Sequence, residues 1–277
     1  MARLILVVAA IAAGVLAQSQ SEPRLAFEVA SVKSNKSEGR PGMEFGANGR
    51  FSARNVPLLI LVSTAYNVPF QGPRLKGFTV EAASERYDIE ATAESGAIPA
   101  GASKLVREAK MKRMLQTLLE DRFKLKMRRE MKETPVYAVI VGKNGPKLTK
   151  SKIEEKDCPD GDLGASGQCH QFRGGMGRGL HADAISMVDL VEAVSNWADR
   201  PVIDRTGLEG LFELNTDGWT PMIPLPLGGN EEEGRAFADP ARPTLYMIFD
   251  RLGLKMESSK APIEMFFVEH VEKPSEN

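Results

Sequence analysis

Cys158 and Cys169 are the two cysteines of this 277-residue chain, and they lie 11 positions apart in a segment rich in glycine and aspartate. In an oxidising compartment this spacing favours a disulfide that closes a short loop. A metal site is the alternative, since side chains that bind metals lie beside the pair, namely Asp157, Asp160, Asp162 and His170. Structural zinc sites, however, use cysteines only about two to four residues apart. The sequence therefore favours the disulfide, and we predict no metal and no cofactor.

The three histidines, His170, His181 and His270, stand in neither a metal-ligand nor a catalytic-triad spacing. We expect His181 and His270 in strands and interpret both as structural. The glycine-rich segment 174–179 superficially resembles a phosphate-binding loop, but it follows no buried strand and lacks the Gly-Lys-Ser/Thr of that motif. We interpret it as a flexible hinge between two halves of the chain. The sequence accordingly assigns no catalytic residue.

A binding site is expected between these halves, near the hinge at 173–179 and a proline- and glycine-rich loop at 219–239. Loops of this kind often carry contact residues. The side chains that suit a ligand or partner there are Arg173, Arg178, His181, Asp183 and Trp219. Residues 104–132 are a further candidate surface, because they hold eleven basic and four acidic side chains. This excess fits either an anionic partner or a solvated face.

The two halves are suggested by a repeat within the chain. Residues 51–58 resemble 180–187, and 119–127 resemble 248–256, both at an offset of 129. Two segments with one offset indicate an ancient duplication. We therefore predict an α+β fold of two tandem, internally duplicated lobes, each running strand, helix, strand, helix, strand, strand, with helices packed on small mixed sheets.

The expected boundaries follow from the repeat and from composition. They are a signal peptide at 1–17, a first lobe at 24–150, a linker at 151–178 that holds the cysteine pair, and a second lobe at 179–277. Apolar residues at helical spacing predict a helix over 104–122. Strands are predicted at 124–131 and 136–141 on either side of a turn with Pro135, and strands at 254–258 and 263–271 close the second lobe.

Helix caps are expected at two equivalent places. Asn55 precedes a run of apolar residues and is predicted to cap the first helix, with Pro57 just inside it. Ser186 is predicted to cap the corresponding helix of the second half, which should run to about residue 198.

The N-terminus resembles a signal peptide, with Arg3 before an apolar run at 4–16 and small residues before Gln18. An uncleaved anchor is the alternative, but the run is shorter than the roughly 20 residues that span a bilayer. No later stretch is apolar for long enough, so we predict no transmembrane segment after cleavage and a periplasmic or secreted protein. The formal net charge of −1 argues against a nucleic-acid binder.

Four segments are distinctive in combination: FEVASVK (27–33), GRFSARNVPL (49–58), LEDRFKL (119–125) and RPVIDRTGL (200–208). Together they resemble the soil-associated exported proteins abundant in acidobacteria, a family of unknown function. The resemblance covers nearly the whole mature chain and implies export, with no established activity. Related domains in membrane proteins that resemble beta-lactam-sensing metallopeptidases imply sensing or binding. The second half is also similar to the short N-terminal domain of secretins and TonB-dependent receptors, an α+β unit for protein–protein contact.

We therefore expect an exported, non-catalytic protein that binds an envelope protein or a cell-wall component. An envelope hydrolase with a non-standard site is one alternative, and a sensor that binds a small molecule between the lobes is another. The positions that the repeat preserves are mainly apolar or form an Asp-Arg pair at a helix end, and this favours binding over catalysis. The sequence assigns no ligand identity and no oligomeric state.

Overall fold

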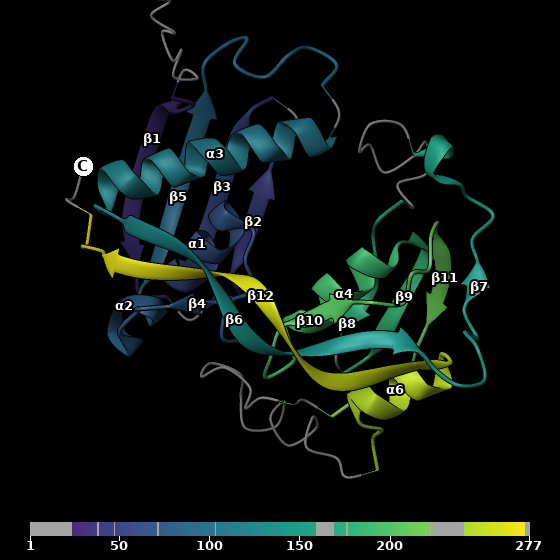
Figure 1. Ribbon diagram of the computed structural model, residues 1–277. Coiled ribbons are helices and arrows are strands. Elements are labelled where there is room, and N and C mark those ends of the chain that lie inside the picture. The colour runs from purple at the N-terminus through teal and green to yellow at the C-terminus, as the bar shows by residue number, and fades with distance from the viewer. Residues whose placement is uncertain are drawn as a thin grey trace, which may run out of the picture.

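The computed structural model describes residues 24–37, 39–46, 48–70, 72–102, 104–158, 169–175, 177–220, 222 and 241–274. The predicted signal peptide and most of the predicted loop at 219–239 lie outside these residues. Within them the chain is a mixed α+β fold in which helices pack on small sheets, as the sequence predicts (Figure 1). The described strands form three four-stranded sheets.

The first sheet is antiparallel and belongs to the N-terminal lobe. Its strand order is β1 (Phe27–Asn35), β5 (Arg86–Ala93), β3 (Arg50–Pro57) and β2 (Gly42–Phe45). Helices α1 (Leu58–Tyr66) and α3 (Lys104–Arg122) pack on each other and on this sheet (Figure 1). The bounds of α3 confirm the predicted helix, and its buried residues recur at helical spacing because they face one core. Those in the N-terminal core are Met111, Leu115, Leu118 and Leu119.

The start of α1 differs from the prediction. Strand β3 runs on to Pro57, which is the N-cap of α1. Asn55 has a φ of 53° and its backbone N–H donates to Asp88 Oδ1 at 2.8 Å. It therefore kinks the end of the strand and does not cap the helix. A short helix, α2 (Val80–Ser84), follows α1 before β5 and is capped by Thr79.

The second antiparallel sheet belongs to the C-terminal lobe. Its order is β7 (Thr149–Lys150), β11 (Phe212–Asn215), β9 (Gly179–Ile185) and β8 (Arg173–Gly175). Helices α4 (Met187–Ser195) and α6 (Leu245–Arg251) share a core with this sheet. Ser186 caps α4 as predicted, because its Oγ accepts from Asp189 N–H at 3.2 Å while Asp189 Oδ2 accepts from Ser186 N–H at 2.7 Å.

The third sheet is a long ribbon that runs through both lobes. Strands β6 (Lys126–Val141) and β12 (Leu254–His270) pair antiparallel along nearly their whole length (Figure 1). Two short strands extend it in parallel, β10 (Val202–Asp204) beside β6 and β4 (Leu75–Lys76) beside β12. One end of the ribbon supplies Val139 and Met256 to the C-terminal core, and the other supplies Val268 to the N-terminal core.

The strands predicted on either side of Pro135 are one strand, and the pair predicted at 254–271 is likewise one strand, so the predicted breaks were wrong. Tyr137 N–H donates to Pro201 O at 2.9 Å on the β10 side. The backbone groups of successive residues in a strand point alternately to its two edges. Pro135, two residues before Tyr137, therefore also points its backbone nitrogen away from β12. Phe266 N–H likewise donates to Arg74 O, just before β4. Pro262 lies four residues earlier on the same edge, so its nitrogen also faces away from β6. Neither proline removes a hydrogen bond from the β6–β12 ladder.

The order of elements is compatible with the predicted duplication, which stays a prediction. Strands β3 and β9 begin at 50 and 179, and helices α1 and α4 begin at 58 and 187, both 129 residues apart. In the ribbon Glu133 lies opposite Pro262, and 262 − 133 is again 129. Each half also gives a short parallel strand, β4 or β10, to the long strand of the other half.

The segment predicted as a linker is partly built into the C-terminal lobe. A 3-10 helix at Glu155–Asp157 and strand β8 lie within it, and β8 forms a hairpin with β9 in which Gly175 lies opposite Gly179. Gly179 has a φ of 80°, and a Cβ there would lie 1.8 Å from Thr216 O. The described glycines therefore allow a tight hairpin, and the interpretation of 173–179 as a flexible hinge was wrong.

We expect the lobes to unfold together, because β6 and β12 supply both cores. Leu115→Ala, in the N-terminal core, should lower the free energy of unfolding by about 2–5 kcal/mol. Trp197 and Trp219, the two tryptophans of the chain, both lie in the C-terminal core. In a urea titration of this variant, the unfolding midpoint seen by tryptophan fluorescence should therefore shift by the same amount as the midpoint seen by far-UV circular dichroism. Arg113→Ala on the exposed side of α3 is the control and should change stability by about 0.5 kcal/mol or less. A fluorescence midpoint that stays in place while the dichroism midpoint falls contradicts this expectation.

Candidate functional site

An open groove lies between the two lobes. The N-terminal lobe lines it with the end of α1 and the loop that follows, and the C-terminal lobe lines it with α4 and β10; Ile263 of β12 completes it. Asn67, the C-cap of α1, and Asn196, the C-cap of α4, both line the groove and lie 129 positions apart. A groove between the lobes thus exists, but among the described residues neither the predicted hinge at 173–179 nor the predicted loop at 219–239 lines it.

Short contacts hold the walls of this groove in place. Asn67 has a φ of 51°, the left-handed conformation that ends many helices, and its side-chain Oδ1 accepts from Lys112 Nζ at 3.0 Å. On the opposite wall, Ser195 Oγ donates to Val191 O at 2.7 Å and accepts from Val202 N–H at 3.1 Å. The second contact joins α4 to β10, so the outer edge of β10 is partly closed to a further strand.

The groove carries charges of opposite sign on its two sides. Arg74 lies on the N-terminal side, where its Nε donates to Glu264 O at 3.2 Å and its guanidinium lies 5.9 Å from the centre of the Phe266 ring. Burial lowers the pKa of Arg74, but a guanidinium titrates so far above neutrality that it stays charged. Glu192 and Asp204 line the other side. Phe70, Val188 and Ile203 add apolar surface to the groove.

These groove residues were not among the predicted site residues. Sequence reasoning named the hinge and the loop at 219–239, whereas the groove is formed by α1, α4 and β10. The signal that could have found it is the predicted repeat, since its offset of 129 relates Asn67 to Asn196.

Three of the predicted site residues gather elsewhere, on the exposed surface of the β8–β9 hairpin. Arg173 Nη2 lies 3.9 Å from Asp183 Oδ2, and His181 lies beside Arg173 across the hairpin. His181 Nδ1 lies 2.7 Å from Asn215 Oδ1, and its Nε2 lies 3.0 Å from Arg178 O. The two ring nitrogens therefore contact neighbouring structure, as expected of a structural histidine. Arg178 contacts this cluster only through its backbone carbonyl, which lies against His181.

Trp219 is not at a binding surface. Its side chain is fully buried in the C-terminal core, where its ring lies 5.6 Å from that of Trp197 in an edge-on arrangement. Large aromatic side chains contribute much to the stability of a core when they are buried away from water. Its predicted role as a contact residue was therefore wrong, because the position before the glycine-rich loop anchors that part of the chain inside the lobe.

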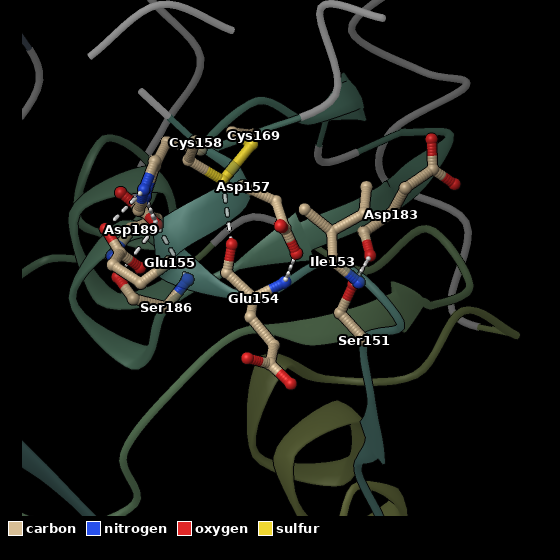
Figure 2. Close-up of a disulfide and its surroundings, with 11 residues drawn as sticks. Ser151, Ile153, Glu154, Glu155, Asp157, Cys158, Cys169, Asp183, Ser186 and Asp189 are labelled. Atoms are coloured by element: carbon tan, nitrogen blue, oxygen red, sulfur yellow. Dashed lines mark hydrogen bonds and ion pairs between the residues drawn. A yellow bond between two sulfur atoms is a disulfide. The ribbon is translucent and has the colours of Figure 1, made fainter. Parts of the chain in front are cut away.

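Cys158 and Cys169 form a disulfide, which confirms the prediction over the metal alternative (Figure 2). Both sulfurs lie in a small apolar cluster with Ala184 and Leu211. His170, directly after the bond, donates its backbone N–H to Ala184 O at 2.8 Å. The disulfide therefore ties the 3-10 helix to the sheet of the C-terminal lobe. Of the other predicted metal ligands, Asp160 and Asp162 lie outside the described residues, and the described part of the chain contains no cluster of histidine, cysteine and acidic residues suited to a metal ion.

His170 bridges two carboxylates beside the disulfide. Its Nδ1 lies 2.8 Å from Asp189 Oδ2 and its Nε2 lies 3.0 Å from Glu155 Oε1. Burial by itself lowers the pKa of His170, but the hydrogen bond and charge of Asp189, with those of Glu155, outweigh it and raise the pKa above its usual value. Ser186 Oγ contacts the same oxygen of Asp189 at 2.7 Å. The serine and the histidine thus share a carboxylate and do not face each other, so this is a helix cap and not a catalytic triad.

Comparison with known proteins gives a family but no function. The sequence profile described as "Protein of unknown function (DUF3738)" matches residues 59–271. No curated protein and no solved structure matches the chain. Among the described residues, no helix is both long and apolar enough to cross a membrane. The resemblance to an uncharacterised family is thereby confirmed, while the acidobacterial origin and the likeness to secretin domains stay predictions.

The histidine bridge predicts a pH-dependent stability. Because the pKa of folded His170 is raised above its usual value of 6.5, its contribution is fully present below that value and is lost as the pH rises through the folded pKa. His170→Gln should therefore lower the free energy of unfolding by about 1–2 kcal/mol near pH 5 and by less near pH 9. Urea unfolding of both proteins at the two pH values measures the difference. Glu155→Gln, which removes the more exposed partner, should reduce the pH dependence in part, and a loss that is equal at both pH values contradicts the assignment.

Proposed function

The chain belongs to the DUF3738 family of proteins of unknown function, and from this premise we propose that it is an exported, non-catalytic protein that binds a peptide segment of an envelope protein in its interlobe groove. The groove itself carries the proposal. It is open to solvent, it is lined by both lobes, and it joins apolar side chains to charges of both signs.

Export is supported by the disulfide. Such bonds form and persist in oxidising compartments and are rare in the cytosol. Cys169 is almost fully buried, and the bond closes a loop of 11 positions. A disulfide that closes a loop of this size stabilises the folded protein by about 3 kcal/mol, because it restricts the unfolded chain. The signal-peptide pattern at 1–17 points to the same location, the periplasm or the exterior.

An extended peptide fits the lining of the groove. Arg74 and Lys112 on the N-terminal side suit carboxylates, and Glu192 on the opposite side suits an ammonium or guanidinium group. Val188 on α4 is 55% exposed, so the apolar surface of the groove is accessible. A peptide offers apolar side chains, both charges and backbone hydrogen-bonding groups along one strand. A cell-wall component is the other partner predicted from the sequence.

The two alternatives require other geometry. A hydrolase of the serine type needs a histidine that faces a nucleophile, whereas His170 and Ser186 both contact Asp189. A small-molecule sensor is best served by a cavity that buries most of its ligand, whereas the interlobe groove is open. These observations favour the peptide-binding proposal.

We expect a photoreactive phenylalanine analogue at position 188 to cross-link one envelope protein that the same analogue at position 80 does not. Val188 and Val80 are both exposed valines on helices, but Val80 lies on α2, outside the groove. Cross-links are formed in an envelope extract of the source organism and identified by mass spectrometry. A synthetic peptide that covers the cross-linked segment should then bind the purified chain.

The affinity of that peptide tests the site. Val188→Asp should weaken binding about tenfold, which corresponds to roughly 1.4 kcal/mol, while Val80→Asp should leave the dissociation constant unchanged. Isothermal titration calorimetry measures both. Identical cross-links from the two positions, or equal affinities of the two variants, contradict the proposal. A glycan or peptidoglycan fragment cross-linked only at position 188 would instead favour the cell-wall partner.

A further inference from the structure

The middle of the ribbon is exposed on β6. Six consecutive residues of β6, from Arg128 to Glu133, are exposed, and Met131 among them is 63% exposed. On the opposite strand Pro262 is exposed as well. Both cores lie to the ends of the ribbon, at Val139 and Val268. Among the described residues, β10 pairs with the outer edge of β6 only at residues 137–139, so the earlier part of that edge is free there (Figure 1).

The hydrogen-bond pattern shows which residues point to this free edge. Tyr137 N–H and Val139 C=O bond to the β10 side. The pairing of β6 with β12 shows no register shift from Met127 to Val141, so the alternation is unbroken. Arg129, Met131 and Glu133 therefore point their backbone N–H and C=O groups away from β12. Among the described residues, these groups have no hydrogen-bond partner.

The corresponding edge of β12 is covered differently. Arg205 Nη2 donates to Lys260 O at 3.4 Å, and Arg74 Nε donates to Glu264 O at 3.2 Å. Between them Pro262 has no N–H to offer. The outer edge of β12 is thus blocked by side chains and a proline, whereas the outer edge of β6 presents the backbone pattern that accepts another strand.

The side chains on the free edge are self-complementary. Read from 129 to 133, the sequence is Arg-Glu-Met-Lys-Glu. When two copies run antiparallel with Met131 opposite Met131, Arg129 lies opposite Glu133 and Glu130 lies opposite Lys132. Every charge then meets the opposite charge, four pairs in all, around a central contact between the methionines. We propose that the free edge of β6 is a homodimer interface in which residues 129–133 of two copies of this chain pair as antiparallel strands.

The backbone supports the same register. Residues directly opposite in an antiparallel pair either both point toward the partner or both point away. In this register Met131 faces Met131 and Arg129 faces Glu133, and all of these point their backbone groups outward. Pro135 comes next on the same edge and has no N–H, so the ladder ends after Glu133. The register that matches the charges therefore also forms backbone hydrogen bonds.

The charges are available for this contact. Within the described residues Arg129, Lys132 and Glu133 form no ion pair. The guanidinium of Arg129 stacks 5.4 Å from the centre of the Phe266 ring. Glu130 contacts Arg128, an exposed pair that contributes little by itself. Charged edges normally discourage association with other strands. Here the order of charges admits a second copy while repelling most other sequences.

Charge reversal tests the proposal. Lys132→Glu places two carboxylates opposite each other at positions 130 and 132, and Glu130→Lys places two ammonium groups there. Each variant alone should therefore self-associate at least tenfold more weakly than the native chain. An equimolar mixture of the two should dimerise again, because each chain then meets the opposite charges. Sedimentation velocity of the purified chain at low salt, from micromolar to several hundred micromolar, measures all three. Lys260→Glu on the blocked edge of β12 is the matched control and should leave the association unchanged.

The mixture also shows that the two variants are folded, since misfolded chains do not restore each other. Higher salt should weaken the native dimer because the ion pairs are exposed. A native chain that remains monomeric throughout the concentration range overturns the proposal. A dimer that neither reversal weakens, or that Lys260→Glu weakens equally, overturns it as well. Binding in the interlobe groove is measured with separate variants and is independent of these outcomes.

Discussion

The antiparallel pairing of β6 with β12 is the interaction on which the rest of the structure depends. Both strands begin in one lobe and end in the other. Each supplies apolar side chains to the C-terminal core at one end and to the N-terminal core at the other. The short strands β4 and β10 have only two and three residues, and each is held by one long strand of this pair. Isolated strands of that length have no stability of their own. Without the ribbon, neither lobe would keep its neighbouring strand and the groove would lose a wall.

The groove follows from the same exchange of strands. Strand β10 comes from the second half of the chain but pairs with β6, which comes from the first half. This pairing brings the end of α4 toward the end of α1, and Asn67 and Asn196 then line one groove. Ser195 fixes the distance between α4 and β10 through its two hydrogen bonds. The geometry of the groove is therefore set by backbone pairing in the ribbon, and the side chains on its walls are left to determine what binds there.

Elements with local signals could be predicted from the sequence. The stripe of apolar residues in α3 and the capping box at Ser186 and Asp189 depend on neighbours three or four positions away, so the pattern alone defined them. Pro135 misled the prediction because a proline is compatible with a strand only when its nitrogen faces a free edge, and this depends on where β10 lies. The groove and the buried position of Trp219 likewise depend on contacts between distant segments. The disulfide was predicted because its partners are close in sequence and no other cysteine competes.

Folding restricts the choice of side chains less in the exposed middle of the ribbon than at its ends. At Val139 and Val268 the core requires apolar side chains of a given size. Residues 129–133 pack against neither core, apart from the stacking of Arg129 on aromatic rings, so folding places little restriction on which charges stand there. Lysines alone would be enough to protect a free edge from aggregation. An order of charges that complements itself in a register that also satisfies the backbone is a stronger requirement than protection imposes, and recognition of a second copy accounts for it.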